Sequence, residues 1–273
     1  MFKTRNVVLL EAKLSKKVIG MGLTDALLWC LSTERKMNDR SGIYGFTQRT
    51  LAYNSNRIEG STLSEEQTAA LFEEGFLPPT EDIYKAKDIE EMNGHFLMFN
   101  HMLENMEEVL PEKLIKELHY ELKAGVFEDR TNGYAIGDYK RRPNFVGNMR
   151  TTLPEDVGCQ MESLLEWYHS VRYKNLETLA ILHVKYESVH PFQDGNGRTG
   201  RIIVFRECLK NNITPFIVQN SNRAVYITAL RNAQADGDFT GLVNYFKSEQ
   251  DVYRKQCEFF CVEDRYAECV LKQ

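Results

Sequence analysis

The pattern of hydrophobic and polar positions along the chain is helical almost throughout. Apolar residues recur three and four positions apart, so that Leu179, Leu182, Tyr186 and Val189 share one face. Strand-like alternation is nearly absent. The pattern predicts helices over approximately 22–57, 82–106, 111–124, 154–173, 176–189, 198–210, 222–235 and 239–264.

Two local signals mark helix ends in the first third of the chain. Gly60 follows the first helical region and is the kind of residue at which a helix stops. Thr62-Leu-Ser-Glu65 has the form of a capping box, which predicts that the next helix begins there.

One stretch, residues 132–154, departs from the helical pattern. Gly133, Gly137, Pro143 and Gly147 punctuate it, with aromatic and β-branched residues between them. This composition is typical of a loop or a short hairpin. The fold class predicted from the whole pattern is therefore all-α with one small β-hairpin.

Composition narrows the classes of function. The chain has 273 residues, of which 42% are hydrophobic, so it can support a packed core. Its net charge of −5 argues against nucleic acid as the main partner. No apolar run approaches a membrane span of ~20 residues, and the first residues do not form a signal peptide. The six cysteines form no CxxC pair. These features predict a cytoplasmic protein with reduced thiols and no membrane partner.

Residues 190–201 combine groups that bind phosphates. Gly195 and Gly197 allow backbone N–H groups to approach an anion closely. A helix is predicted to begin near Arg198, and its N-terminus adds partial positive charge at the same place. Arg198 and Arg201 lie three positions apart and face the same way. Two guanidinium groups beside a helix N-terminus predict a polyphosphate site.

The same segment carries a base and a metal ligand. His190 is suited to accept a proton near neutral pH. Asp194 offers the hard oxygen that Mg²⁺ prefers when phosphates supply other ligands. Phosphate-binding and proton-accepting groups in one loop indicate transfer of a phosphorus-centred group.

An alternative interpretation of the glycines is the dinucleotide-binding pattern GxGxxG, which residues 195–200 match literally. That pattern requires a β-strand before it and an acidic residue about 20 positions later. A helical pattern precedes it here, and residues 219–223 contain no acid. The dinucleotide interpretation is therefore set aside.

The segment His190-Pro-Phe-Gln-Asp-Gly-Asn-Gly-Arg-Thr-Gly-Arg201 resembles the signature of the Fic family, HPFx[DE]GNGRxxR, at every defined position. The resemblance covers roughly residues 110–240. It implies a Fic-type helical bundle whose hairpin, about residues 137–152, is a flap that aligns a target segment by strand pairing. It also implies an enzyme that transfers AMP from ATP to a protein hydroxyl group with Mg²⁺ as cofactor.

The resemblance implies a role for each motif residue. His190 would deprotonate the target hydroxyl, and Asp194 would hold Mg²⁺ between the α- and β-phosphates. The remaining implied contacts are those of Gly195, Asn196 and Gly197 with the phosphates, Arg198 with the β-phosphate and Arg201 with the γ-phosphate.

Positions around the motif also receive implied roles. Phe192 would anchor the loop in the core, and Tyr226 with Gln234 would line the adenine pocket. A helix-packing role for Tyr226 is the alternative. Relatives similar to the Doc toxin carry Lys at the position of Gly197 and act as kinases, so Gly197 favours AMP transfer.

Residues 55–60 resemble the inhibitory motif of the family, [ST]xxxE[GN], through Ser55, Glu59 and Gly60. The motif precedes the catalytic segment, as in the subclass with an N-terminal inhibitory helix. Glu59 is then expected to pair with Arg201 and to occupy the place of the γ-phosphate. An ordinary helix end at Gly60 is the alternative.

The resemblance also divides the chain and leaves several functions open. It implies an N-terminal helical region with the inhibitory helix over 1–108, a Fic core over 109–240, and a C-terminal helix and tail over 241–273. The expected partners are ATP, an unidentified target protein and, as in many relatives, a second copy in a homodimer. Modification of the chain itself, transfer of another nucleotide such as UMP or of another phosphate-containing group, removal of AMP, and a non-enzymatic binding role remain as alternatives.

Overall fold

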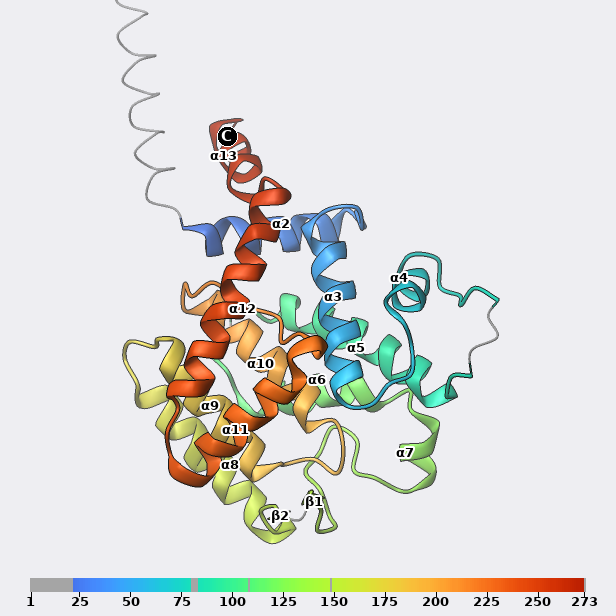
Figure 1. The fold of residues 1–273 in the computed structure, drawn as a ribbon, viewed down its shortest axis with the longest axis vertical. Helices are drawn as coiled ribbons and strands as arrows, with labels where there is room; N and C mark the ends of the chain where they lie inside the picture. Colours follow the sequence, from blue (N-terminus) through green and yellow to red (C-terminus); the bar gives the residue numbers. More distant parts are fainter. Residues whose placement is uncertain (1–21, 80–82, 108, 148, 273) are drawn as a thin grey trace, which may run out of the picture.

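Helices make up nearly all of the regular structure, as the sequence pattern predicts. The computed structural model describes residues 22–79, 83–107, 109–147 and 149–272. The elements, shown in Figure 1, are α2 (Leu23–Lys36), α3 (Ile43–Ile58), α4 (Glu65–Glu73), α5 (Ala86–Glu104), α6 (Glu112–Lys123), α7 (Phe127–Thr131), β1 (Phe145–Val146), β2 (Met149–Arg150), α8 (Pro154–Ser170), α9 (Leu176–Val189), α10 (Asn196–Lys210), the short 3₁₀ helix η1 (Asn220–Asn222), α11 (Arg223–Asp236), α12 (Thr240–Phe259) and α13 (Val262–Lys272).

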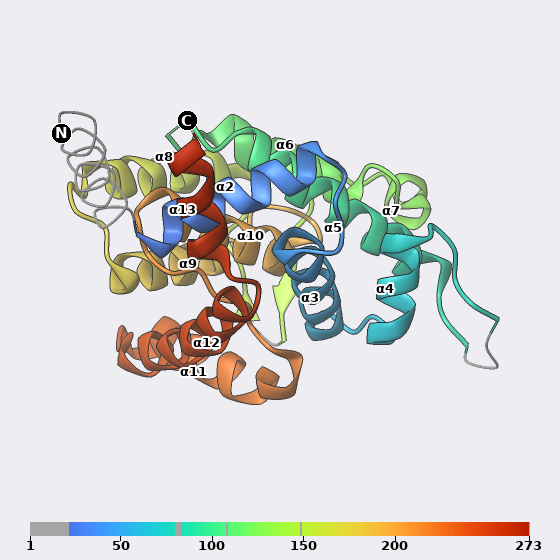
Figure 2. The same ribbon diagram turned by 90° about the horizontal axis from the view of Figure 1, so that it is seen from above.

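Helix α10 lies in the interior, and helices from both the first and the second half of the chain pack against it. It contacts α2, α3, α5, α6 and α9, and the view in Figure 2 places it inside the ring of these helices. Every residue of α10 except Gly197 and Lys210 is buried. Because buried charges require partners, Arg206 pairs with Glu207 and also donates to the carbonyl oxygen of Asn105 at 2.7 Å.

Helices α5 and α6 approach each other closely at Gly94. A Cβ atom at this position would stand only 2.1 Å from the carbonyl oxygen of Leu122. The two helices pack across the predicted boundary between residues 108 and 109. The division of the chain into 1–108, 109–240 and 241–273 stays a prediction.

The predicted hairpin is present. Strands β1 and β2 pair antiparallel with Phe145 opposite Arg150 and Val146 opposite Met149. Gly147 in the turn has a φ of 59°, a left-handed conformation that favours glycine. Figure 1 shows the hairpin at the lower edge of the molecule, and the side chains of Phe145 and Val146 are exposed.

Two predicted helical regions are each divided in two. Region 22–57 contains α2 and α3, separated by a turn in which Asn38 has a φ of 54°. Region 239–264 contains α12 and the start of α13, separated at Cys261, which has a φ of 49°. Both breaks place a non-glycine residue in the left-handed region, which a periodicity of apolar residues does not reveal.

The cap of α4 is two residues later than predicted. The hydroxyl of Ser64 accepts the N–H of Gln67 at 3.1 Å, and the Gln67 side chain accepts the N–H of Ser64 at 2.8 Å. The hydroxyl of Thr62 instead donates to Asp88 Oδ2 at 2.5 Å. The capping-box assignment to Thr62 and Glu65 was therefore wrong, because Thr62 ties the start of α4 to α5.

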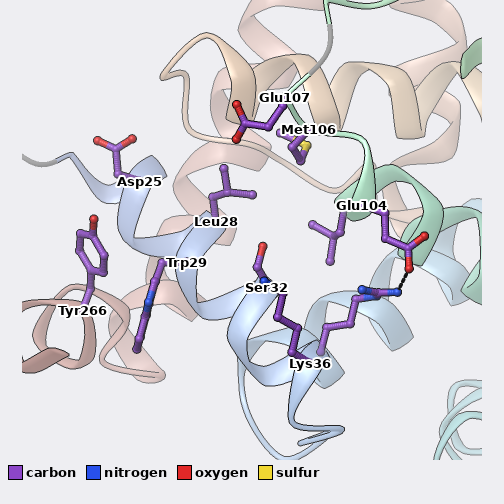
Figure 3. A pocket seen from close by; sticks show the side chains of 11 residues that line it. Asp25, Leu28, Trp29, Ser32, Lys36, Glu104, Met106, Glu107 and Tyr266 are labelled. Carbon is purple, nitrogen blue, oxygen red and sulfur yellow. Dashed lines mark hydrogen bonds and ion pairs between the residues drawn. The ribbon is translucent and has the colours of Figure 1, made fainter. Parts of the chain in front are cut away.

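Three further observations concern membrane spans, the start of the chain and the surface. Within the described residues, no helix combines the length and apolarity needed to cross a bilayer. The start of the chain, for which no targeting segment is predicted, lies outside the described residues. A surface pocket of about 670 Å³ is lined by residues of α2, α13 and the end of α5 (Figure 3), and its Arg35 pairs with Glu104.

Candidate active site

His190 stands at the carboxyl end of α9, where the helix must stop. Pro191 follows it and cannot continue the helical hydrogen bonds. His190 closes the last turn by donating its N–H to the carbonyl oxygen of Tyr186 at 2.9 Å, and it has a φ of 51°. A non-glycine residue in this conformation stores strain, which is common at functional sites.

The imidazole of His190 is held by side chains from the flap and from α10. Nδ1 accepts from the carboxamide nitrogens of Asn144 and Asn196, each at 3.1 Å. Burial lowers the pKa of His190 to about 4, and the nearby Lys140 adds to the decrease, while Glu59 and Asp194 act in the opposite direction. The ring is therefore neutral at neutral pH, and because Nδ1 accepts both hydrogen bonds, its lone pair lies on Nδ1 and its proton on Nε2.

The loop between α9 and α10 is pinned to the core. Phe192 is fully buried and stacks on His119 with ring centroids 3.8 Å apart. Asn196 Oδ1 accepts the N–H of Phe192 at 2.7 Å. His119 Nδ1 accepts the N–H of Gly137 at 2.9 Å, so its Nε2–H donates to the carbonyl oxygen of Asp194 at 3.0 Å. Phe192 is thus placed in the core as the resemblance implies.

Helix α10 begins at Asn196, two residues earlier than the sequence predicts. Gly195 caps it with a φ of 85°, a conformation open to glycine at little cost. The first turn of a helix has N–H groups without intrahelical partners, which bind anions. These groups of α10 lie beside the His190 loop, so N–H groups able to bind an anion and the imidazole ring share one end of the helix.

The guanidinium group of Arg198 is buried, and acidic and amide side chains contact both of its terminal nitrogens. Arg198 Nη1 lies 2.6 Å from Glu91 Oε2 and donates to Asn56 Oδ1 at 3.2 Å, while Nη2 lies 3.5 Å from Asp194 Oδ1. Burial alone would lower the pKa of Arg198, but Glu91 and Asp194 outweigh it and raise the pKa. The positive charge of Arg198 is therefore permanent.

Arg201 meets the end of α3. Its Nε donates to the hydroxyl of Ser55 at 2.9 Å, and its Nη2 donates to the Ser55 carbonyl oxygen at 3.0 Å and to Glu59 Oε1 at 2.7 Å. Gly60, with a φ of 95°, directs the chain away after Glu59. A Cβ atom on Gly197 would stand 2.3 Å from Glu59 Oε1, so the carboxylate rests against the first turn of α10.

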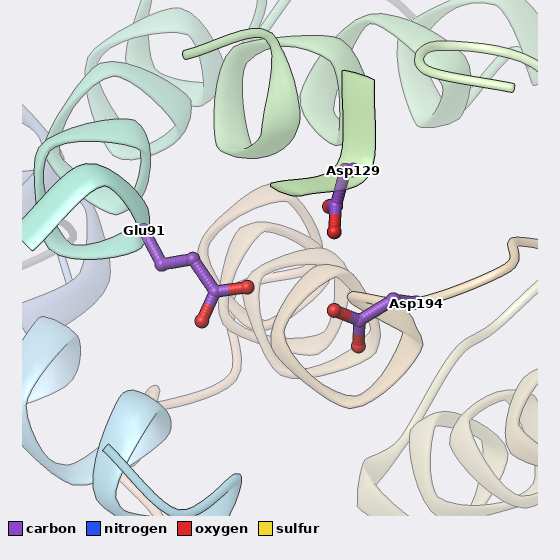
Figure 4. A group of neighbouring side chains, drawn as sticks. All are labelled: Glu91, Asp129 and Asp194. Carbon is purple, nitrogen blue, oxygen red and sulfur yellow. The ribbon is translucent and has the colours of Figure 1, made fainter. Parts of the chain in front are cut away.

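Three carboxylates gather beside the loop, as Figure 4 shows. Candidate ligand oxygens of Glu91, Asp129 and Asp194 lie within 4.8 Å of one another. The ammonium group of Lys123 contacts all three, at 2.6 Å from Asp129 Oδ2 and 2.8 Å from Asp194 Oδ2. Burial would raise the pKa of Asp194, but Arg198, Lys123 and Lys87 hold it well below its usual range.

Of these three carboxylates, only Asp194 is substantially exposed. Its side chain is 36% exposed, whereas those of Glu91 and Asp129 are 9% and 1% exposed. The Lys123 ammonium, together with the Arg198 guanidinium that pairs with Glu91, already balances the charge of the two inner carboxylates. A divalent cation shared with phosphates would therefore meet Asp194, whose ionised carboxylate fits such an ion.

Tyr226 lies on α11 and is buried against α9. Its hydroxyl is 2.6 Å from His183 Nε2, and Gln234 farther along α11 donates to the Ser188 hydroxyl at 3.2 Å. Both contacts join α11 to α9, which is the helix-packing role considered for Tyr226. That Tyr226 and Gln234 line an adenine pocket stays a prediction.

Comparison with known proteins identifies the segment that carries this site. Residues 109–207 match the family described as Fic/DOC. This segment is a Fic domain. It contains His190, Asp194, Arg198 and Arg201, whereas Ser55 and Glu59 lie outside it.

Curated relatives of the chain are named for the same domain. It is 28% identical over 198 residues to the protein adenylyltransferase fic-1 of Caenorhabditis elegans and 28% identical over 196 residues to the protein adenylyltransferase Fic of Aedes aegypti. Each match covers 71% of this chain and 38% of the relative. The chain therefore spans less than two fifths of the length of these proteins.

Solved structures share the fold. The Fic domain-containing signalling protein of Bacteroides thetaiotaomicron superposes with a TM-score of 0.65 at 21% identity, covering 90% of this chain and 97% of that one. Fic-1 of C. elegans also gives 0.65 at 21% identity, covering 98% of this chain and 76% of that one. The helical bundle with its hairpin is thus a Fic-type fold.

Several residues that hold the Fic-domain site were not found from the sequence. They are polar partners of the motif: the buried Asn56, Glu91, Lys123 and Lys140, and the half-buried Asn144. A signal existed for Glu91 and Lys123, since each lies on the apolar stripe of an amphipathic helix where a charged residue is unusual.

Proposed function

We propose that this chain transfers AMP from ATP to a hydroxyl side chain of a protein. The observation that carries the proposal is the convergence of a neutral imidazole, a helix N-terminus and two buried guanidinium groups at one end of α10. The relatives named protein adenylyltransferase support the same reaction. The proposed partners are accordingly ATP and a target protein.

The proposed reaction begins with the target hydroxyl. Its proton passes to His190 while its oxygen attacks the α-phosphorus of ATP. The bond from the α-phosphorus to the bridging oxygen breaks, and pyrophosphate leaves with the electron pair. The amides of Asn196 and Gly197 contact the phosphates, and Arg198 and Arg201 stabilise the charge on the leaving group.

The proposed cofactor is Mg²⁺, held by Asp194 together with the phosphates. When bound, it would neutralise charge on the α- and β-phosphates. Asp194 is suited to this role because it is ionised, partly exposed and fixed by Lys123 and by the N–H of Gly195, which donates to Asp194 Oδ1 at 2.7 Å.

The Glu59–Arg201 contact is proposed to inhibit the reaction. The Glu59 carboxylate lies at the first turn of α10 and takes one guanidinium nitrogen of Arg201, so it competes with the γ-phosphate for both. ATP then binds with its α-phosphate displaced. A displacement of about 1 Å costs about a hundredfold in rate.

The Glu59→Gly variant is expected to incorporate about a hundredfold more AMP than the unaltered chain, because Arg201 is released to bind ATP. Incorporation is measured with ATP labelled at the α-phosphate, Mg²⁺ and a mixture of proteins that includes the chain itself. Glu74→Gly is the matched control, since Glu74 is an exposed glutamate that caps α4 as Glu59 caps α3.

Two further arms decide between the reactions. The double variant Glu59→Gly/His190→Ala should incorporate no label, and retained incorporation would remove His190 from the mechanism. Label transferred from the γ-phosphate, or from UTP, would show a different group transfer. Equal incorporation by Glu59→Gly and the unaltered chain would contradict the inhibitory role of Glu59. Loss of label from a modified protein on adding the unaltered chain would reveal the reverse reaction.

A further inference from the structure

Lys140 is a buried cation with only neutral partners. It lies just before β1, and only 2% of its surface is exposed. Its Nζ donates to Asn144 Oδ1 at 2.8 Å, to Thr151 Oγ1 at 2.7 Å and to the His190 carbonyl oxygen at 2.8 Å. Among the described residues it forms no ion pair with a carboxylate. Its positive charge is therefore not neutralised at close range, and it lies next to the catalytic histidine.

Lys140 also determines which way the Asn144 carboxamide faces. Asn144 Oδ1 is committed to Lys140 and Thr151, so its NH₂ group must point toward the loop after α9. There it donates to the Phe192 carbonyl oxygen at 2.9 Å and lies 3.1 Å from His190 Nδ1. The imidazole thus receives a hydrogen bond whose direction is fixed by a neighbouring ammonium group.

We propose that Lys140 and Asn144 are positioning residues for His190, which fix the orientation of its ring through the flap and oppose its protonation. The inference rests on the proposed function, in which His190 is the base. A hydrogen bond donated to Nδ1 favours the neutral ring, and a nearby positive charge disfavours the protonated ring. Both effects act in the same direction.

The other charges around His190 come from different elements. Glu59 at the end of α3 and Asp194 in the loop both favour protonation, whereas Lys140 opposes it. Burial is the largest cause of the lowered pKa of His190, and Lys140 is the second. Removing Lys140 should therefore raise the pKa of His190 part of the way back to its ordinary value. Removing Asn144 should also raise the pKa, while Asn196 still contacts Nδ1.

The test is the pH dependence of AMP incorporation in the Glu59→Gly background. Lys140→Met should move the acidic midpoint of the rate upward by about one pH unit. Its rate at pH 5 should then fall to about half its rate at pH 7.5, while the parent changes little. Lys140→Arg should restore the parental midpoint because the charge returns. Arg141→Met, which removes the adjacent exposed cation, should leave the midpoint unchanged.

A second readout does not depend on the reaction. In the otherwise unaltered chain, NMR titration of the His190 ring, assigned by its loss in His190→Ala, should give a higher midpoint in Lys140→Met and Asn144→Ala. Asn144→Ala serves alone if circular dichroism shows that Lys140→Met is unfolded. A uniform loss of rate at both pH values, with an unshifted His190 midpoint, would reduce both residues to structural supports and overturn the inference. If the chain does not transfer AMP, the proposed function fails, but the NMR midpoints of His190 still test the effect of Lys140 and Asn144 on its ring.

Discussion

At the scale of single residues, Gly197 is where the first turn of α10 meets the Glu59 carboxylate at the end of α3. Its missing side chain leaves room for the Glu59 carboxylate against α10. The position has no left-handed backbone, so alanine is conformationally acceptable there. A side chain at position 197 would therefore act on the contact with Glu59 and not on the backbone conformation.

Gly197→Ala should destabilise the unaltered chain more than it destabilises the Glu59→Gly variant. The added Cβ would stand 2.3 Å from Glu59 Oε1 and 3.0 Å from Arg201 Nη1. In the unaltered chain the Glu59 carboxylate must therefore move away from α10, whereas the Glu59→Gly variant has no carboxylate to displace. Urea unfolding of the four proteins in this cycle should give a coupling free energy of about 1 kcal/mol. Additive effects would mean that the carboxylate does not rest against this turn.

The sequence identifies the residues of the site better than their partners. Residues 190–201 are adjacent in the chain, so their chemistry can be read together. Arg198, however, depends on Glu91, which lies far earlier in the chain and reaches it only because α5 packs on α10. Such pairs follow from tertiary packing, which periodicity does not specify.

At the scale of elements, glycines in two helices have opposite consequences. Gly94 in α5 faces the backbone of α6, whereas a Cβ atom added to Gly158 in α8 would meet no neighbouring atom within 4 Å. One glycine permits a close helix contact, and the other is only a weak helix former.

Gly94→Ala should lower the free energy of unfolding by at least about 2 kcal/mol, because α5 and α6 must separate to admit the methyl group. Gly158→Ala should raise the same quantity by up to about 1 kcal/mol, since alanine favours the helix and meets nothing. Urea denaturation measures both. Equal effects of the two substitutions would be inconsistent with the close approach at Gly94.

Element types were predictable and several of their ends were not. Helix α9 runs from Leu176 to Val189 as predicted, because its apolar face is regular and Pro191 ends it. The long regions at both ends of the chain each contain an additional break, since Asn38 and Cys261 adopt conformations rare for non-glycine residues.

At the scale of the whole molecule, burial of charge around α10 links stability to pH. Glu187 of α9 has an oxygen that is buried without a hydrogen-bond partner among the described residues. Burial raises its pKa from 4.5 to about 8; Arg201 opposes this and Glu59 adds to it. The folded chain therefore holds a proton that the unfolded chain releases between these two pH values.

The stabilising effect of this proton is complete below pH 4.5 and is lost as the pH rises toward about 8. Glu187→Gln should remove that dependence, so its advantage in unfolding free energy over the parent should grow from pH 5 to pH 8. Glu177→Gln, on the exposed side of the same helix, is the control. Parallel stability curves for parent and Glu187→Gln would refute the assignment.

The contact between Glu59 and Arg201 joins residues separated by 142 positions. Translation runs from the N-terminus, so Glu59 is synthesised several seconds before Arg201 at ordinary rates of about 5–20 residues per second. A growing chain therefore never contains Arg201 without already containing Glu59, the carboxylate with which it pairs in the folded chain.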